Sequence, residues 1–277
     1  MRPHMILTLR HLFSLLFPLV LVTLAAQAQQ RPLTGGAAVD PSTRFARETF
    51  DRALAHFSHA QYAAALEGFD GFASSALHGD APAGESERLL YIEAEYHAAL
   101  CAVYLYHKDA VWRIDQFVER HPESTWVPKL QWELGNYQYR RKKWSLALDA
   151  FEGLNPRRLS KSLRTEFHFK RGHARFEKND LESARGDLLK VVGDASARPE
   201  HLEAARYYLA HIAYDEGRLT TALAAFEELL AVEAFHNAVP VYIAQILHQL
   251  ERYEDIVERA PAWLDDTADL RPSDRQE

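Results

Sequence analysis

The amino-acid sequence predicts an all-α protein, an α-solenoid of about six helical hairpins. Its composition permits a sizeable core, because 47% of its 277 residues are hydrophobic and 26% are charged. Gly and Pro number only 12 each, too few for the many turns of an all-β chain, while Ala and Leu are abundant. The same pattern of small and aromatic residues returns every 34 to 45 positions, which indicates a row of similar units.

Each unit has two anchor positions. The first anchor is a small residue, at Ala53, Ala98, Gly135, Gly172, Ala210 and Ala244. The second anchor follows twelve residues later, at Ala65, Ala110, Ala147, Ala184, Ala222 and Ile256, and four residues beyond it stand Phe69, Ile114, Phe151, Leu188, Phe226 and Ala260. Three residues before the second anchor, Tyr62, His107, Trp144, Leu181, Leu219 and Tyr253 are expected to open a new helix. Small residues allow two helices to approach closely and large residues fill the groove between them, so each unit should be a helical hairpin.

Turn signals divide the chain in the way that hairpins require. Short polar segments at 141–143, 178–180 and 215–218 join the two helices of a unit. Longer segments with proline, at 121–124, 155–156 and 198–199, separate one unit from the next. The first two units are farther apart, and residues 74–86, with Gly79, Pro82 and Gly84, should form an irregular loop.

The anchors carry a family resemblance. It is clearest in Leu134, Gly135, Asn136 and Tyr137 with Trp144, Ala147 and Phe151, and in Ala210, Leu219, Ala222 and Phe226. These residues resemble the tetratricopeptide repeat (TPR) family over about residues 44–264, with the first, second and sixth units departing most from the pattern. The segment 121–124 followed by Leu134 and Gly135 also looks like exported bacterial repeat proteins of the cell envelope. The resemblance implies a right-handed solenoid whose first helices line an inner groove that binds a partner protein.

The first 28 residues are typical of a cleavable secretory signal. Arg2 and Arg10 precede an apolar run at 12–24, and the small-residue pattern at 26–28 follows it. We therefore expect an exported protein, most simply periplasmic, with an uncleaved N-terminal anchor as the alternative. Residues 29–43 should be a flexible lead-in, 44–264 the repeat domain and 265–277 an acidic flexible tail. The single cysteine, Cys101, lies in an apolar helical stretch, which favours a buried inert thiol over a nucleophile.

A stripe of large side chains on the first helices is the candidate partner-binding groove. It comprises the residues three before, one after and four after the first anchor, which fall on one side of a helix. The candidate residues are Trp132, Asn136, Tyr139, Phe169, His173, Phe176, Tyr207, His211, Tyr214 and Gln245, with Val241 and His248 in the same register. Aromatic rings and hydrogen-bonding groups together suit an extended peptide or a partner helix. The same residue types would also suit the core between repeats, and the sequence leaves both interpretations open.

Charge is unevenly distributed along the chain. Residues 140–178 contain twelve Lys or Arg against four acidic residues, whereas residues 200–277 contain six against sixteen. A basic patch of Arg140, Arg141, Lys142, Lys143, Arg157 and Arg158 could meet an acidic protein face or an anionic lipid surface. Solvated turns that happen to be basic, or contact between basic and acidic ends of two copies, are the alternatives. The net charge of −7 does not favour general nucleic-acid binding.

The sequence contains none of the motifs expected of common enzymes: no glycine-rich phosphate loop, no Gly-x-Ser-x-Gly elbow and no His-Glu-x-x-His helix. The pairs His56 with His59 and His168 with His173 lack the further ligands of a metal site. We therefore expect no catalytic residue, no metal and no cofactor.

The sequence thus predicts a non-enzymatic scaffold or adaptor that binds an envelope protein or peptide through its concave groove. Two alternatives stay open. One is an envelope enzyme that uses the solenoid as a platform, for example on wall glycan. The other is the N-terminal part of a longer repeat assembly, or self-association through the last repeat, because Pro272 prevents a long capping helix after Trp263.

Overall fold

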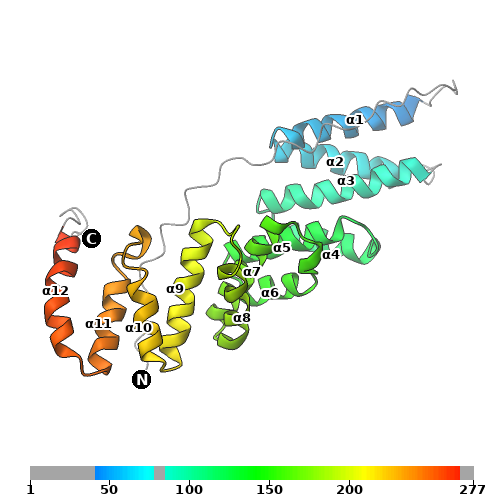
Figure 1. Ribbon diagram of the computed structural model, residues 1–277. Helices are drawn as coiled ribbons and strands as arrows, with labels where there is room; N and C mark the ends of the chain where they lie inside the picture. The colour runs from blue at the N-terminus through cyan, green and yellow to red at the C-terminus, as the bar shows by residue number, and fades with distance from the viewer. Residues whose placement is uncertain (1–40, 78–84, 269–277) are drawn as a thin grey trace. The chain divides into compact units, whose positions relative to one another are not determined.

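The computed structural model describes residues 41–77 and 85–268, and this part of the chain is helical throughout (Figure 1). The α-helices are α1 (Pro41–Ser58), α2 (Tyr62–Leu77), α3 (Glu85–Tyr104), α4 (Ala110–Arg120), α5 (Val127–Arg140), α6 (Trp144–Glu152), α7 (Lys161–Glu177), α8 (Leu181–Val192), α9 (Pro199–Asp215), α10 (Leu219–Glu227), α11 (Val239–Gln249) and α12 (Tyr253–Ala268). Two short 3₁₀ helices, η1 (Pro156–Arg158) and η2 (Glu233–Phe235), lie in connections between hairpins.

The predicted boundaries compare with these helices as follows. The repeat domain expected at 44–264 falls within helices that run from Pro41 to Ala268. Helices α2 and α3 occupy both ends of the loop expected at 74–86, and its centre, 78–84, lies outside the described residues. The expected signal at 1–28, most of the lead-in and the end of the tail also lie outside them.

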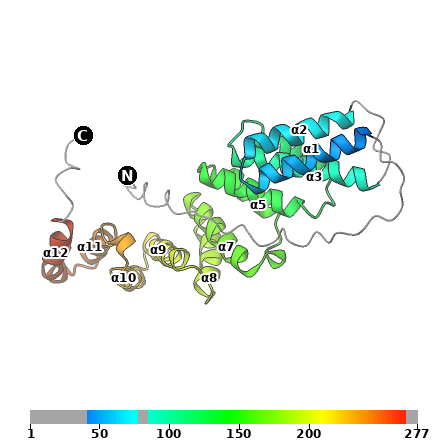
Figure 2. The ribbon, with the colours of Figure 1, turned by 90° about the horizontal axis from the view of Figure 1, so that it is seen from above.

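The helices pack as six consecutive hairpins, which confirms the predicted fold class. The first helix of each hairpin packs against the second, as α1 does on α2 and α7 on α8, and each second helix then packs on the first helix of the next hairpin. Figures 1 and 2 both show this neighbour-to-neighbour arrangement, for example in α9, α10 and α11. Neither helix of a hairpin could bury its apolar surface alone, and stacking supplies the cover.

The anchors lie where the helices of a hairpin approach most closely. All five alanines at the second anchor are fully buried. At the first anchor of the third hairpin, the ring of Phe151 occupies the space that a Cβ of Gly135 would need. In the first hairpin, Gly68 faces Ala53 in the same way. The small residues are therefore required by the closeness of the backbones.

The six hairpin turns share one backbone device. Each contains a residue with positive φ, at Ala60, Tyr106, Lys142, Asn179, Gly217 and Glu251. The next residue donates its N–H to a carbonyl five positions back, as Lys143 does to Gln138 at 2.9 Å, which is the hydrogen bond of a Schellman C-cap. Only one of the six residues is glycine. The other five have a Cβ atom, so the left-handed conformation costs them steric energy.

The start of the second helix is correctly predicted in five hairpins and wrong in one. Helix α4 begins at Ala110 and not at His107. Lys108 and Asp109 form an additional turn, in which the Asp109 carboxylate contacts the His107 ring and accepts a hydrogen bond from Arg113 at 2.8 Å. Asp109 is the N-cap of α4 but makes no capping hydrogen bond, so its contacts with His107 and Arg113 account for the additional turn.

The core is divided among the hairpins. Five clusters of buried side chains are present in the described residues, and most join the helices of neighbouring hairpins. Cys101 belongs to the first of them along the chain, is fully buried, and has a pKa raised to about 12 by burial. This confirms the prediction of an inert thiol. Within the described residues, no helix is both long and apolar enough to span a membrane.

Candidate functional site

The predicted groove stripe lies between hairpins at its start. Trp132 is only 4% exposed and its ring packs against Phe151. Lys170 of the following hairpin lies over the Trp132 ring, at 5.3 Å from its centroid, and donates a hydrogen bond to Asn136 at 2.7 Å. Burial lowers the pKa of Lys170, and Glu166, which accepts a hydrogen bond from it at 2.5 Å, opposes that effect. These side chains already satisfy one another.

His173 joins three hairpins in the middle of the stripe. Its Nδ1 lies 2.5 Å from the hydroxyl of Tyr139, in the hairpin before, and its Nε2 lies 3.0 Å from the hydroxyl of Tyr208, in the hairpin after. The carboxylate of Glu177 lies 3.4 Å from the same Nε2, so the ring contacts three polar side chains. Burial raises the pKa of both tyrosines, which keeps them neutral. The Trp144 ring covers the histidine at a centroid distance of 5.3 Å.

The same arrangement continues through the fourth and fifth hairpins. Ring contacts between successive hairpins include Phe169 with His201 at 4.5 Å, Phe176 with Tyr208 at 5.0 Å, Tyr207 with Phe235 at 4.6 Å and His211 with Tyr242 at 4.3 Å. The hydroxyl of Tyr214 accepts a hydrogen bond from Gln249. Burial lowers the pKa of both His201 and His211 to about 4, so these rings are neutral at pH 7. From α5 to α10, the side chains of the stripe therefore contact one another across hairpins, which favours the interpretation of the stripe as core between repeats.

The stripe becomes open only in the last hairpin. Val241 is 47% exposed, and Gln245 and His248 are exposed as well. No later hairpin covers these positions within the described residues. This part of the stripe alone presents a free face.

The predicted basic patch is divided between two edges of the array. Arg140, Arg141, Lys142 and Lys143 form the turn between α5 and α6. Arg157 and Arg158 lie in η1, beyond the far end of α6. Nine helical residues span about 13 Å, so the two groups lie at opposite ends of the hairpin. The sequence suggested one patch because residues 140–158 are close along the chain, but an antiparallel hairpin separates them.

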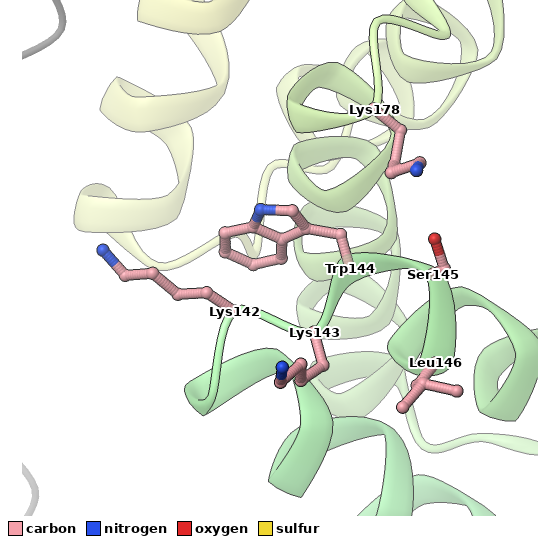
Figure 3. A pocket seen from close by; sticks show the side chains of 6 residues that line it. All are labelled: Lys142, Lys143, Trp144, Ser145, Leu146 and Lys178. Carbon is pink, nitrogen blue, oxygen red and sulfur yellow. The ribbon is translucent and has the colours of Figure 1, made fainter.

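The turn between α5 and α6 forms a shallow pocket with the turn of the next hairpin. Its lining residues are Lys142, Lys143, Trp144, Ser145, Leu146 and Lys178 (Figure 3). We call this set the turn-edge surface. Leu146 is 50% exposed, and Figure 3 shows the indole of Trp144 above the side chains of Lys142 and Lys143, with Lys178 on the turn of the next hairpin. None of the three lysines forms an ion pair with a residue that the structure describes.

Helix α6 adds to the positive character of this surface. Its N-cap is Lys143, whose side chain has no acceptor and makes no capping hydrogen bond. The first N–H groups of a helix lack intrahelical partners and carry the positive end of its dipole. Nearby cations are positioned by aromatic rings, since Arg140 donates to the hydroxyl of Tyr106 and Arg141 to that of Tyr137. The surface thus combines positive charge with exposed apolar area.

Sequence reasoning missed Lys178, Trp144 and Leu146 as members of this surface. A usable signal was present, because Lys142 and Lys178 occupy neighbouring positions in consecutive turns, and consecutive turns lie side by side in a solenoid. The sequence analysis grouped cations by distance along the chain instead.

A second charged cluster is buried within the fourth hairpin. Asp187, which is 1% exposed, accepts hydrogen bonds from Arg171 at 2.7 Å and Arg175 at 2.6 Å, and lies 2.9 Å from His168. Burial opposes its ionisation, but the hydrogen bonds from His168 and Arg171 outweigh burial and hold the pKa of Asp187 well below its usual range. All four side chains belong to α7 and α8, so the cluster joins the hairpin. No group of His, Cys, Asp and Glu in the described residues could hold a metal ion.

Comparisons with known proteins give structural similarity at low sequence identity. No family model and no curated protein sequence matches the chain. Similar solved structures include apo RapI, at 14% identity and a TM-score of 0.48 over 83% of this chain and 67% of that one. TPR-like repeats of a Podosopora anserina kinesin light chain match at 17% identity and a TM-score of 0.47, over 70% of this chain and 97% of that one. NprR in complex with its peptide NprX matches at 12% identity and a TM-score of 0.40, over 83% of this chain and 67% of that one.

The chain's own hairpins define its class. Six helical pairs with buried small anchors, left-handed turn residues and second-to-first helix stacking make it an α-solenoid of TPR-like repeats.

Proposed function

We propose that this protein is a non-enzymatic interaction scaffold that binds an acidic segment of a partner protein at the turn-edge surface. The observation that carries the proposal is the pocket lined by Lys142, Lys143 and Lys178 together with Trp144 and Leu146, in which none of the lysines forms an ion pair with a described residue. One carboxylate lies nearby, that of Glu177, whose pKa is lowered mainly by its hydrogen bond to His173, with a contribution from Lys142. Unpaired cations around exposed apolar side chains recognise acidic peptides that also carry an apolar anchor.

This surface replaces the predicted groove as the candidate binding site. Binding at the stripe between α5 and α10 would break contacts such as those of His173 with Tyr139 and Tyr208. Binding at the turn edge breaks none, because Lys142, Lys143, Leu146 and Lys178 are exposed in the free protein. A peptide fits better than nucleic acid, since the net charge of −7 repels a long polyanion.

The test is the affinity of a fluorescent peptide of Glu and Asp with one central Leu, measured by anisotropy. We expect binding that weakens as salt is added, because exposed charges are screened within about 10 Å at 0.1 M. The double variant Lys143→Gln with Lys178→Gln should lose about tenfold or more in affinity, since a hydrogen bond to a charged group contributes about 1.5–3 kcal/mol.

The matched control is Arg157→Gln with Arg158→Gln, which removes the same charge from the opposite edge. Its affinity should stay within about twofold of that of the parent chain, which is a difference of less than about 0.5 kcal/mol in binding free energy. Equal losses in the two double variants would mean non-specific attraction and would reject the site. Leu146→Ser should also weaken binding, and a peptide in which Gln replaces Glu should not bind.

We further propose that the protein acts after export, in the periplasm. The support is the sequence of residues 1–28, with its two arginines, apolar run and small-residue pattern. Expression with its own N-terminus, followed by fractionation and mass measurement, tests this. A mature chain that begins at Gln29 in the periplasmic fraction is expected, whereas a full-length chain retained in the cytoplasm would contradict export.

A further inference from the structure

The last hairpin exposes positions that are buried or half-buried in the earlier hairpins, with His107 of the second hairpin as the exception. On α11, Val241, Gln245 and His248 occupy the positions of Trp132, Asn136 and Tyr139 in the third hairpin. On α12, Tyr253 and Val257 stand three before and one after the second anchor. Val257 is 75% exposed, whereas Leu223, its counterpart on α10, is 5% exposed. We call Val241, Gln245, His248, Tyr253 and Val257 the terminal stacking face.

The geometry of this face suits a helix. At each of the five earlier steps, the first helix of the next hairpin packs on the second helix of the hairpin before it, from α3 on α2 to α11 on α10. Helix α12 is the last labelled helix in the row in Figure 1. An incoming helix would therefore meet the same kind of groove that the chain repeatedly fills with its own helices.

The opposite end of the array does not match this face. The residue five before the first anchor packs on the preceding hairpin, and it is buried as Leu130 in α5, Phe167 in α7 and Val239 in α11. In α1 the same position is Glu48, which is exposed, as are Arg52 and Phe45 nearby. A second copy stacking head to tail would bring the Glu48 carboxylate onto a face that already carries Glu254 and Glu258, which disfavours that occupant.

Charge defines the chemistry of the occupant. Glu254 and Glu258 lie beside Tyr253 and Val257 on α12, are exposed, and form no ion pair with a described residue. Earlier steps show how such a carboxylate is matched. Arg113 of the second hairpin bonds Asp70 of the first at 2.7 Å, and Arg259 of the sixth bonds Glu227 of the fifth at 2.5 Å. In both pairs the later hairpin supplies the cation.

We propose that the terminal stacking face docks a basic amphipathic helix of a partner protein. Its apolar stripe would cover Val241, Tyr253 and Val257, and flanking Lys or Arg would pair with Glu254 and Glu258. The face is separate from the turn-edge surface and opposite in charge, so the scaffold would hold two partners of opposite charge at once.

The experiment uses the whole chain and a labelled helical peptide with leucines at i, i+3, i+4 and i+7 flanked by lysines. Anisotropy gives its affinity, with a scrambled peptide of the same composition and a glutamate-flanked peptide as probes of helix and charge. Val257→Asp should weaken binding about tenfold or more, and Glu254→Lys with Glu258→Lys should do the same. Leu189→Ser, at an apolar position on α8 that is 53% exposed, is the control and should leave the affinity unchanged.

Each of these results supports or overturns the proposal. Loss with Val257→Asp but not with Leu189→Ser, and no binding of the scrambled or glutamate-flanked peptides, supports the proposal. Equal binding of the scrambled peptide, or unchanged affinity of both face variants, overturns it. A concentration-dependent dimer in light scattering that Val257→Asp abolishes would identify a second copy as the occupant and would also overturn it. Because Val257 is so exposed, the Val257→Asp variant should have the same urea midpoint of unfolding as the parent chain. Circular dichroism measures both midpoints.

Discussion

The first-helix stripe differs between the third hairpin and the last one. In the third hairpin, Trp132 and Asn136 are buried beneath side chains of the next hairpin. In the last hairpin, Val241 and Gln245 occupy the same positions and face solvent. The helices are equivalent in register, so the difference comes from the neighbour. In a repeat protein, one position can be core or binding surface according to whether another unit follows.

The composition of the stripe changes with its burial. Apart from Asn136, the covered positions are aromatic or histidine, and they contact one another across hairpins, as His173 does with Tyr139. The open positions are Val, Gln and His, with less apolar area to expose. The last hairpin is thereby suited to a helix that is not always present, because its exposed apolar area is limited.

The largest expected effect comes from truncating equivalent positions in the two regions. Trp132→Ala should lower the free energy of unfolding by about 3–5 kcal/mol, because it leaves a cavity between hairpins. Val241→Ala should cost less than about 0.5 kcal/mol, since that side chain is half exposed. Urea unfolding followed by circular dichroism measures both.

Similar costs at the two positions would contradict the assignment of this stripe to core and surface. A large cost at Val241 would mean that its face is covered in solution. Dilution then distinguishes self-association from another cause, since a dimer loses stability as concentration falls.

The second effect compares two glycine anchors. Gly135→Ala should destabilise by about 2 kcal/mol, because the new methyl group would overlap the Phe151 ring, which is itself packed against Trp132. Gly172→Ala should cost less than Gly135→Ala, since its nearest neighbours, Leu188 Cγ at 3.0 Å and Asp187 Cβ at 3.2 Å, need to move by only a few tenths of an ångström and alanine gains about 1 kcal/mol in a helix. Thermal and urea midpoints test the difference, and a larger cost at Gly172 would contradict it.

Most of the fold was accessible from the sequence because repetition averages out local ambiguity. The second anchors predicted the buried alanines, and five of six helix starts followed from the residue three before them. The exception, α4, depends on Asp109, whose bonds to His107 and Arg113 extend the turn. A side-chain interaction at a single turn does not change the spacing of the repeats, so periodicity cannot predict it.

The candidate site was less accessible because it depends on which turns meet. The sequence placed Arg157 with Lys142, yet the hairpin puts them at opposite edges and brings Lys178 to Lys142 instead. Whether Trp132 or Tyr207 faces a groove or a neighbour depends on the spacing between hairpins. Large side chains satisfy both patterns, so periodicity alone could not distinguish them.

Acid should destabilise the covered region through its histidines. Burial lowers the pKa of His211 and His201 to about 4, below the unfolded value of about 6.5. As pH falls from 6.5 to 4, the unfolded chain takes up protons that the folded chain refuses, so stability decreases across that window. His211→Gln, which installs the residue found at Gln245, should reduce this loss by about 2 kcal/mol.

The measurement is the urea midpoint of unfolding at several pH values from about 7 to about 4. His248→Gln removes a histidine from the exposed end of the stripe and serves as the control. An unchanged pH profile in His211→Gln would show that the ring is hydrated in solution, and the covered region would then be less closed than its contacts indicate.

The smallest effect concerns the turns, which are alike in both regions. Lys142 and Glu251 hold positive φ angles of 56° and 59°. Lys142→Gly and Glu251→Gly should each stabilise the protein by about 1 kcal/mol, because glycine adopts this conformation without steric cost. The gain should be equal in the two hairpins, since it depends on local backbone geometry and not on the neighbour. Only Lys142→Gly should weaken the acidic peptide, so a variant with a higher melting temperature and lower affinity would separate binding at the turn edge from stability. A gain confined to one hairpin would show that stacking alters the turns as well as the stripe.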